Sequence, residues 1–303
     1  MSDSISFSDR LAAAIKKKNN AVCVGLDPRW SQLPSTIRRR VESIGQTPAT
    51  GFRRFCFEVI DVVAPLVPVV KPQMAFFEQY GPSGMQALWE VIHYANEKGL
   101  LVILDGKRND IGSTATAYAN AYLGAGERSA WGADALTVSP YLGEDSLEPF
   151  IERCNQVQAG IFVLAKTSNP GSGFLQDLEI EGTTIAERVA DWIENVNARN
   201  PGECGYGSVG AVVGGTYPEE LAEMRKRMPH TWILVPGYGA QGGKAGDVMG
   251  AFDSNGLGAI VNSSRNIIFA YEGRKGSAND DWQTSVEAAT KEMIAALRGA
   301  KVG

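Results

Sequence analysis

The chain has 303 residues, of which 44% are hydrophobic and 21% charged, and this composition excludes an intrinsically disordered protein. The formal net charge of −5 provides no overall positive field, so a nucleic-acid partner is not expected. The four cysteines contain no C-x-x-C pair, and only two histidines are present. A zinc cluster or a disulfide framework is therefore not expected, and a reducing cytoplasm fits best.

Two stretches of the chain, residues 1–20 and 59–70, bear on whether the protein is exported or inserted into a membrane. Residues 1–20 place acidic residues before a lysine run and lack the apolar core of a secretory signal. The longest nearly apolar stretch, 59–70, is interrupted by Asp61 and two prolines and is too short to cross a bilayer as a helix. Neither secretion nor membrane insertion is expected.

Short runs rich in β-branched residues alternate along the chain with longer amphipathic segments. We predict strands at 21–27, 66–71, 100–105, 135–139, 161–166, 210–213, 232–236 and 259–262. Helical spacing of apolar residues separates them, as at 84–98 and 218–228. Eight strands, each followed by a helix, predict the α/β class and one (β/α)₈ TIM-barrel domain over residues 1–303.

Two connections are longer than the others. They cover residues 28–65 after the first strand and 167–208 after the fifth. The second begins with Ser168, Asn169, Pro170 and Gly171, a composition typical of a flexible loop. Two interpretations of it stay open, a lid over the site and an insertion without function.

Polar residues end several of the predicted strands. They are Asp27, Lys71, Asp105, Ser139 and Lys166. In a TIM barrel the carboxyl ends of the strands converge on one mouth, where the active site lies. Strands also stop at polar residues without any function, and that alternative applies to each residue taken singly.

The densest group of charges follows the apolar strand LLVIL. Asp105 and Lys107 point the same way if the strand continues, because side chains alternate with period two. Lys71, at the end of the preceding strand, can pair with Asp105. Such an array keeps one lysine protonated as an acid and presents a carboxylate to a substrate. The same residues are also compatible with a solvated charged turn.

A second group lies in the loops after the seventh and eighth strands. Barrels frequently bind phosphate there, since glycines let backbone N–H groups approach the oxygens. The first loop reads PGYGAQGG and contains Gln241, Gly242 and Gly243, and the second ends at Arg265, whose guanidinium can clamp an oxyanion. These loops predict a phosphate site, although glycines there also suit tight turns.

Taken in order, these motifs resemble the orotidine 5′-phosphate decarboxylase family, in its longer bacterial (type 2) branch. The resemblance rests on Asp27 in VGLD, Lys71 in VVKPQMAFFE, Asp105 to Thr114, Ser139 in TVSPYLG, Gln241 in PGYGAQGG and Arg265 in NSSRNI. Asn109 stands where the family pattern has glycine, a change that touches loop geometry and no catalytic group. Ser139 stands where some relatives have other residues.

The resemblance implies an activity and a set of catalytic residues. The reaction is decarboxylation of orotidine 5′-monophosphate to UMP and CO₂, the last step of de novo pyrimidine synthesis, without metal or organic cofactor. Lys107 is the implied acid that protonates C6, with Lys71, Asp105 and Asp110 completing the array. Asp110 and Thr114 reach the neighbouring subunit's site, which implies a homodimer.

The resemblance also implies the substrate contacts. Asp27 with Lys71 is expected to bind the ribose hydroxyls, and Ser139 to touch the pyrimidine edge. Gln241, a backbone N–H of the Gly242–Gly243 turn, and Arg265 are expected to bind the phosphate.

Two rival functions remain at this stage. One is a related barrel enzyme acting on sugar phosphates with Mg²⁺, such as a keto-gulonate-phosphate decarboxylase or a hexulose-phosphate synthase. Those relatives place an acidic metal ligand where this chain has Lys71, which argues against them. The other is a non-catalytic nucleotide-phosphate sensor, and the retention of all four charged positions argues against it.

Overall fold

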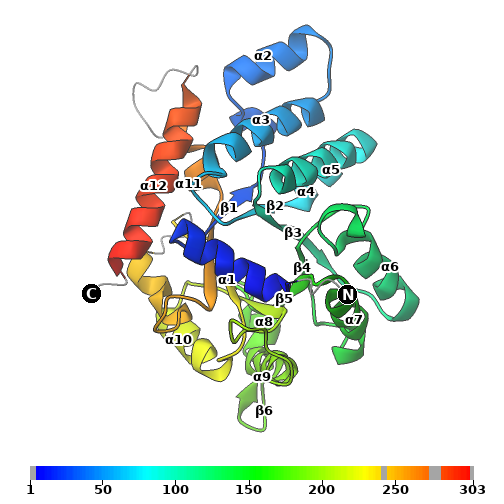
Figure 1. The fold of residues 1–303 in the computed structure, drawn as a ribbon, viewed down its shortest axis with the longest axis vertical. Coiled ribbons are helices and arrows are strands. Elements are labelled where there is room, and N and C mark those ends of the chain that lie inside the picture. Colours follow the sequence, from blue (N-terminus) through cyan, green and yellow to red (C-terminus); the bar gives the residue numbers. More distant parts are fainter. Residues whose placement is uncertain (1–4, 240–243, 273–280, 301–303) are drawn as a thin grey trace.

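The centre of the computed structural model, which describes residues 5–239, 244–272 and 281–300, is a closed barrel of eight parallel strands (Figure 1). The strands are β1 (Val22–Leu26), β2 (Val69–Pro72), β3 (Leu101–Arg108), β4 (Ala135–Val138), β5 (Gly160–Lys166), β8 (Val209–Val213), β9 (Ile233–Val235) and β10 (Ala259–Ser263). They pair in the order β1-β10-β9-β8-β5-β4-β3-β2, and β2 closes onto β1. Each predicted strand is present, and the predicted single-domain (β/α)₈ barrel is confirmed.

Helices surround this barrel. They are α1 (Phe7–Lys18), α2 (Ser35–Ser43), α3 (Pro48–Val63), α4 (Met74–Glu78), α5 (Gly81–Glu97), α6 (Gly112–Tyr122), α7 (Glu148–Val157), α8 (Gly173–Gln176), α9 (Ile185–Asn197), α10 (Pro218–Arg227), α11 (Arg265–Ile268) and α12 (Trp282–Ala300). The helical patterns at 84–98 and 218–228 correspond to α5 and α10. Over the described residues, no helix combines the length and the apolarity that a membrane span requires.

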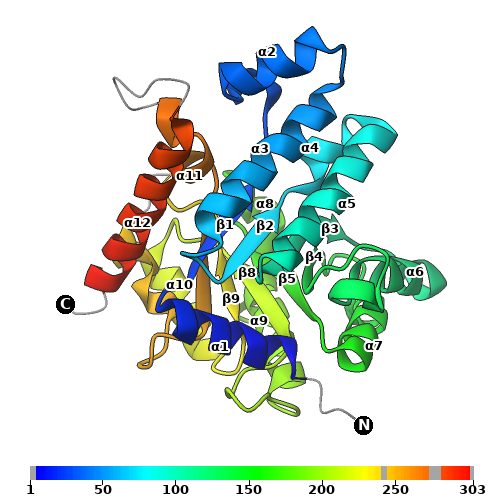
Figure 2. The ribbon, with the colours of Figure 1, turned by 45° about the horizontal axis from the view of Figure 1, so that its top comes forward.

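The inward-facing side chains form a hydrophobic core at the amino-terminal end of the barrel. Helix α1 lies across that end in both views (Figures 1 and 2) and packs Phe7, Leu11 and Ile15 against inward residues of the strands. The inward residues are Cys23, Val69, Ile103, Ala135, Phe162, Val212, Leu234 and Ile260. An ion pair between Arg10 and the buried Asp134 also holds α1 in place. Apolar side chains thus fill the amino-terminal end of the barrel interior. Polar side chains occupy the interior at the opposite, carboxyl-terminal end.

The two long connections supply part of the outer helical layer. Residues 28–65 contain α2 and α3, and α2 stands at the outer side of α3 in both views (Figures 1 and 2), where it buries Ile37 and Val41. Residues 167–208 contain α8, a hairpin of β6 (Glu179–Ile180) and β7 (Thr183–Thr184), and α9. Thr184 and Glu187 form a capping box that explains where α9 begins.

Candidate active site

Polar residues continue the inward-facing positions of three neighbouring strands. Two residues beyond Val69, Ile103 and Ala135 come Lys71, Asp105 and Thr137, so the period of two carries these side chains from the hydrophobic core to the carboxyl end. They line a cavity of about 230 Å³, together with Lys107, Leu164, Thr167, Ser168, Asn169, Val212, Leu234 and Pro236. This position matches the location of active sites in the fold.

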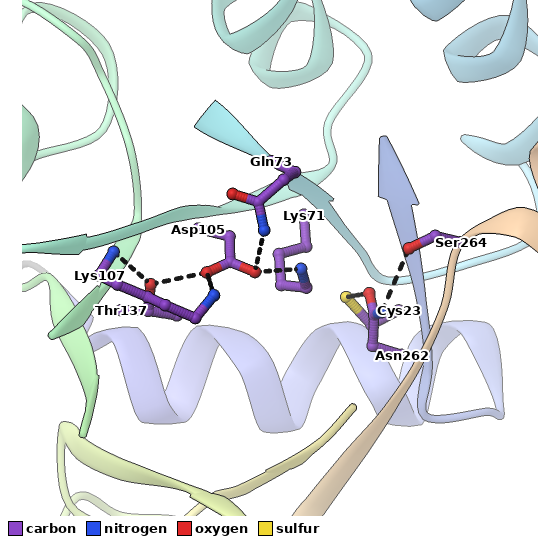
Figure 3. Close-up of polar contacts among 8 residues, drawn as sticks. All are labelled: Cys23, Lys71, Gln73, Asp105, Lys107, Thr137, Asn262 and Ser264. Carbon is purple, nitrogen blue, oxygen red and sulfur yellow. Dashed lines mark hydrogen bonds and ion pairs between the residues drawn. The ribbon is translucent and has the colours of Figure 1, made fainter. Parts of the chain in front are cut away.

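Asp105 is the centre of the polar contacts in this cavity (Figure 3). Its Oδ2 atom accepts hydrogen bonds from Lys71 Nζ at 2.6 Å and Gln73 Nε2 at 2.9 Å. Its Oδ1 atom accepts from Lys107 Nζ at 2.5 Å and Thr137 Oγ1 at 2.9 Å. Donors from three adjacent strands and the residue after β2 therefore hold one buried carboxylate in a single orientation.

Charge pairing keeps this carboxylate and its lysine partner ionised. Burial favours the neutral form of Asp105, but the ammonium groups of Lys71 and Lys107 outweigh it and hold the pKa of Asp105 below its ordinary value. Burial likewise disfavours charged Lys71, but the carboxylates of Asp105 and Asp27 outweigh it and raise the pKa of Lys71 above its ordinary value. The cavity thus contains fixed charges over the ordinary pH range.

Lys107 has an unusual backbone conformation and the most accessible ammonium of the cluster. Its φ is +44°, in the left-handed region that non-glycine residues rarely adopt, and the β3–β4 pairing shifts register between Leu104 and Arg108. The Lys107 N–H donates to Thr137 Oγ1 at 2.9 Å, which compensates part of the strain. The Lys107 side chain is 48% exposed, against 5% for Lys71. Of the two lysines paired with Asp105, Lys107 is therefore the one whose side chain is accessible to a bound molecule.

Gln73 and Thr137 belong to the site and were missed by the sequence analysis. Gln73 lies two residues beyond Lys71, and Thr137 two residues before Ser139, so both follow the strand period that identified their neighbours. An isolated β-bridge between Gln73 and Asp105 extends the β2–β3 pairing to this point. Extending the period of two along each strand end was the signal that would have found them.

A second polar group lies beside the cluster, on β1 and β10 (Figure 3). Buried Asn262 accepts from Cys23 Sγ at 3.5 Å and donates to Ser264 Oγ at 3.4 Å. A Cβ on Gly25 would lie 1.9 Å from Ser264 Oγ, so the β1 backbone approaches this group at a distance that only glycine allows. Burial raises the pKa of the Cys23 thiol to about 12, so the thiol stays protonated.

Three further predicted residues follow strands β1, β4 and β10, and none of them makes one of the four hydrogen bonds to the Asp105 carboxylate. Asp27 follows β1, where its charge acts on Lys71, and its Oδ1 atom is buried without a hydrogen-bond partner among the described residues. Ser139 follows β4 and its hydroxyl accepts from the Tyr141 N–H at 3.4 Å. Arg265 is exposed at the first residue of α11, directly after β10.

Asp110 is half-buried, Thr114 is exposed, and neither residue lines the active-site cavity. Asp110 accepts a hydrogen bond from the Ile111 N–H at 2.8 Å, and Thr114 is exposed in the first turn of α6. Within the described part of the chain, no hydrogen bond or ion pair joins the side chain of either residue to the Asp105 carboxylate. Gln241, Gly242 and Gly243 lie outside the described residues.

Lys166 does not join the cluster, although it ends a strand of the barrel. The β5–β8 pairing is irregular between Leu164 and Lys166, so Leu164 lines the active-site cavity while Lys166 lines another cavity beside α9 and α10. The Lys166 ammonium pairs there with Asp177, and with Glu220 at 3.7 Å. The prediction that Lys166 shares the mouth with the other strand ends is therefore wrong.

Within 5–239, 244–272 and 281–300, no three His, Cys, Asp or Glu side chains form a group that could hold a metal ion. The charged cluster itself combines one carboxylate with two ammonium groups.

A closed (β/α)₈ barrel with a charged cavity at the carboxyl ends of its strands defines the class of barrel enzymes. Residues 20–278 match the model of the orotidine 5′-phosphate decarboxylase / HUMPS family. The orotidine 5′-phosphate decarboxylase of Rhodopirellula baltica is 58% identical, over 97% of this chain and 100% of that protein. The chain belongs to this family.

Two solved structures from Leishmania donovani have the same fold. Its OMP decarboxylase is 33% identical with a TM-score of 0.77, and the match covers 99% of this chain and 100% of that one. Its UMP synthase is 34% identical with a TM-score of 0.79, and the match covers 98% of this chain and 57% of that longer one.

Proposed function

We propose that this protein decarboxylates orotidine 5′-monophosphate to UMP and CO₂, a carboxy-lyase reaction and the last step of de novo pyrimidine synthesis. The Lys71–Asp105–Lys107 cluster carries the proposal, because it supplies fixed charges and an accessible acid in one cavity. The 58% identity to a decarboxylase over nearly the whole chain supports it.

Lys107 acts as the acid in the proposed reaction. The bond between C6 of the pyrimidine and its carboxylate carbon breaks, CO₂ leaves, and the electron pair stays on C6. The Lys107 ammonium stabilises this carbanion, transfers a proton to C6, and regains a proton from water. Asp105 Oδ1, 2.5 Å from Lys107 Nζ, orients the ammonium before substrate arrives, and such preorganisation lowers the barrier.

Ribose binding is assigned to Asp27 and Lys71. The buried Oδ1 of Asp27 lacks a hydrogen-bond partner among the described residues, and a sugar hydroxyl is a suitable donor to it. The negative charges of Asp27 and Asp105 both act on the Lys71 ammonium and favour its charged form. Ser139, after β4, is assigned to the pyrimidine edge.

Phosphate binding is assigned to the loops after β9 and β10. Arg265 is exposed at the start of α11, with its guanidinium available to an oxyanion. Gln241 and the backbone of Gly242 and Gly243 complete the proposed site from the preceding loop. The phosphate does not react, but its binding energy can drive loop closure and raise the rate.

The proposed active form is a C2 homodimer in which Asp110 and Thr114 enter the partner's site. In this chain Asp110 is half-buried and Thr114 is exposed, and neither residue lines the active-site cavity. Exposed apolar side chains accompany them on the loops after the neighbouring strands β3 and β4, with Ile111 56% exposed and Tyr141 74% exposed. A polar group framed by exposed apolar side chains is typical of an interface.

The proposed reaction uses neither a metal nor an organic cofactor. Lys71 occupies the position where the sugar-phosphate relatives are expected to have an acidic metal ligand, and its ammonium is already paired with Asp105 at 2.6 Å. A cation bound there would be repelled by Lys71 and Lys107. The four cysteines are free, as in proteins of a reducing compartment, and we place the protein in the cytoplasm.

A direct assay tests this function. Purified protein is mixed with orotidine 5′-monophosphate, with and without EDTA, and the fall in orotidylate absorbance is followed. We expect turnover that EDTA does not reduce. Protein that binds UMP but leaves orotidylate unchanged would be a nucleotide sensor, and loss of turnover in EDTA would indicate a metal-dependent relative.

A further inference from the structure

The start of the loop after β5 forms part of the wall of the active-site cavity. Thr167, Ser168 and Asn169 line the same cavity as Lys71, Asp105 and Lys107. A Cβ on Gly214 of the neighbouring chain segment would lie 2.9 Å from the Ser168 Cβ, so the loop packs closely on that backbone. This wall therefore has a defined position.

Two consecutive residues at the end of helix α8, Gln176 and Asp177, bind the start of this loop. Gln176 makes two hydrogen bonds to Thr167, and Asp177 forms the ion pair with Lys166. Lys166 and Thr167 are themselves consecutive, so adjacent residues of the loop bind adjacent residues at the end of α8. The contact fixes the conformation of Thr167 at both its backbone and its side chain.

The direction of each hydrogen bond in this contact follows from one fixed donor. The Thr167 backbone N–H can only donate, and it donates to Gln176 Oε1 at 2.8 Å. The other end of the same amide, Nε2, therefore donates to Thr167 Oγ1 at 2.8 Å. Since that hydroxyl has one proton, it donates onward to Asn169 Oδ1 at 2.7 Å. The Asn169 oxygen is thus engaged, so the donors that Asn169 can offer from this cavity wall are those of its Nδ2 atom.

We propose that Gln176 is a positioning residue, which acts through Thr167 to present the N–H donors of Asn169 to the base of the substrate. The inference rests on the proposed function, because a pyrimidine dione offers carbonyl oxygens that accept such donors. Without the relay, the Asn169 amide is free to turn its oxygen toward those carbonyls, and oxygen facing oxygen is repulsive. The start of the 167–208 segment therefore has a role in substrate recognition.

Gln176→Glu is the sharpest test, because it keeps the size of the side chain and reverses one bond. A carboxylate accepts from both the N–H and the hydroxyl of Thr167, so the hydroxyl no longer donates to Asn169. We expect KM for orotidine 5′-monophosphate to rise roughly tenfold with kcat within about threefold of the parent, the effect of losing one hydrogen bond. Thr167→Val, which removes the hydroxyl, should raise KM in the same way. Thr167→Ser, which keeps the hydroxyl, should have the KM of the parent.

Two further variants separate positioning from folding. Phe174→Ala, at an exposed side chain on the same short helix, is the control and should leave KM unchanged. In an Asn169→Ala background, Gln176→Glu should add no further effect, because its target is gone.

Parent-like KM in both Gln176→Glu and Thr167→Val would overturn the relay, as would additive effects in the double variant. UMP affinity is measured in parallel for every variant. If the parent protein did not turn over orotidylate at all, the proposed function would fail, and the UMP affinities alone would then decide the relay.

Discussion

Asp105 determines the electrostatics of the cavity, because its two oxygens accept from four side chains while it is almost fully buried. A buried ion pair is a weak source of stability, since desolvation of both charges offsets their attraction. Breaking it is different, because one charge then stays buried without a partner. In the proposed reaction, the Lys71–Asp105 pair therefore serves to hold charge in place and contributes little as a stabilising contact.

Asp105→Asn should destabilise the fold by about 3–5 kcal/mol, because it leaves the Lys71 ammonium buried without its partner. The measurement is urea unfolding at neutral pH. Glu78→Gln, which changes an exposed carboxylate on α4, serves as the control and should shift stability by less than about 1 kcal/mol. Equal stability of the Asp105→Asn variant and the parent would contradict the buried pair.

The same variant gives a pH dependence of known sign. The folded pKa of Asp105 is depressed, so its contribution is present above the unfolded value of about 3.9 and is lost as pH falls toward the folded value. The pKa of Lys71 is raised, so its contribution is present below about 10.4 and is lost as pH rises through the folded value. The stability difference between parent and Asp105→Asn should therefore shrink as pH falls below about 4, where Asp105 of the parent becomes protonated.

Lys107→Ala should lower kcat by at least about a thousandfold, because it removes both the proton donor and a fixed positive charge. UMP affinity should stay within about threefold, since the proposed phosphate contacts lie elsewhere. Lys98→Ala, which removes a surface lysine paired with Asp61, is the control. Near-normal turnover of Lys107→Ala would exclude it as the acid.

Arg265→Ala should act mainly on binding, because its proposed partner is the unreactive phosphate. We expect KM to rise at least roughly tenfold, as for loss of a charged hydrogen bond, with kcat reduced less. Arg39→Ala, an exposed arginine on α2, is the matched control. An unchanged KM in Arg265→Ala would mean that the phosphate is bound by other residues.

The charged cluster was predictable from the sequence because strand ends and the period of two place Lys71, Asp105 and Lys107 together. Gln73 and Thr137 escaped notice because uncharged side chains gain a role only from the carboxylate that they contact. The prediction for Lys166 failed because an irregularity in the β5–β8 pairing redirects a side chain, and no residue in the strand signals it.

At the scale of elements, buried parallel strands were the easiest to predict. Their β-branched runs are buried on both faces, so hydrophobicity alone marks them. Helix α8 and the β6–β7 hairpin are too short for any periodic pattern, and their positions depend on contacts such as Gln176 with Thr167. The parts of the chain that shape the proposed recognition wall were therefore the least visible in the sequence.

Helix α1 seals the end of the barrel opposite the site, which separates stability from activity. Phe7 is 1% exposed and meets Phe162 edge to face, with ring centroids 6.1 Å apart. Phe7→Ala should lower the free energy of unfolding by about 3–5 kcal/mol in urea titrations, as for other buried aromatic truncations. Phe174→Ala, at a side chain 89% exposed, should change it by less than about 0.5 kcal/mol. A large fall in kcat of folded Phe7→Ala protein would contradict the separation.

At the scale of the whole molecule, the predicted site residues fall into two groups. Lys71, Asp105 and Lys107 share the cavity, whereas Asp110, which is half-buried, and Thr114, which is exposed, lie outside it near exposed apolar side chains. In the proposed dimer, a second copy supplies Asp110 and Thr114 to a site that contains Lys71, Asp105 and Lys107. In a C2 dimer each chain gives Asp110 to its partner and receives the partner's in return.

Mixing two inactive variants tests this exchange. Lys107→Ala and Asp110→Ala homodimers should each be nearly inactive. After unfolding and refolding together in equal amounts, about half of the dimers contain one chain of each kind, and in each of these one site has both Lys107 and Asp110 while the other has neither. Activity should therefore recover to about a quarter of the parent value. Variants refolded separately and then assayed together are the control, and no recovery in the co-refolded sample would show that Asp110 serves its own chain or none.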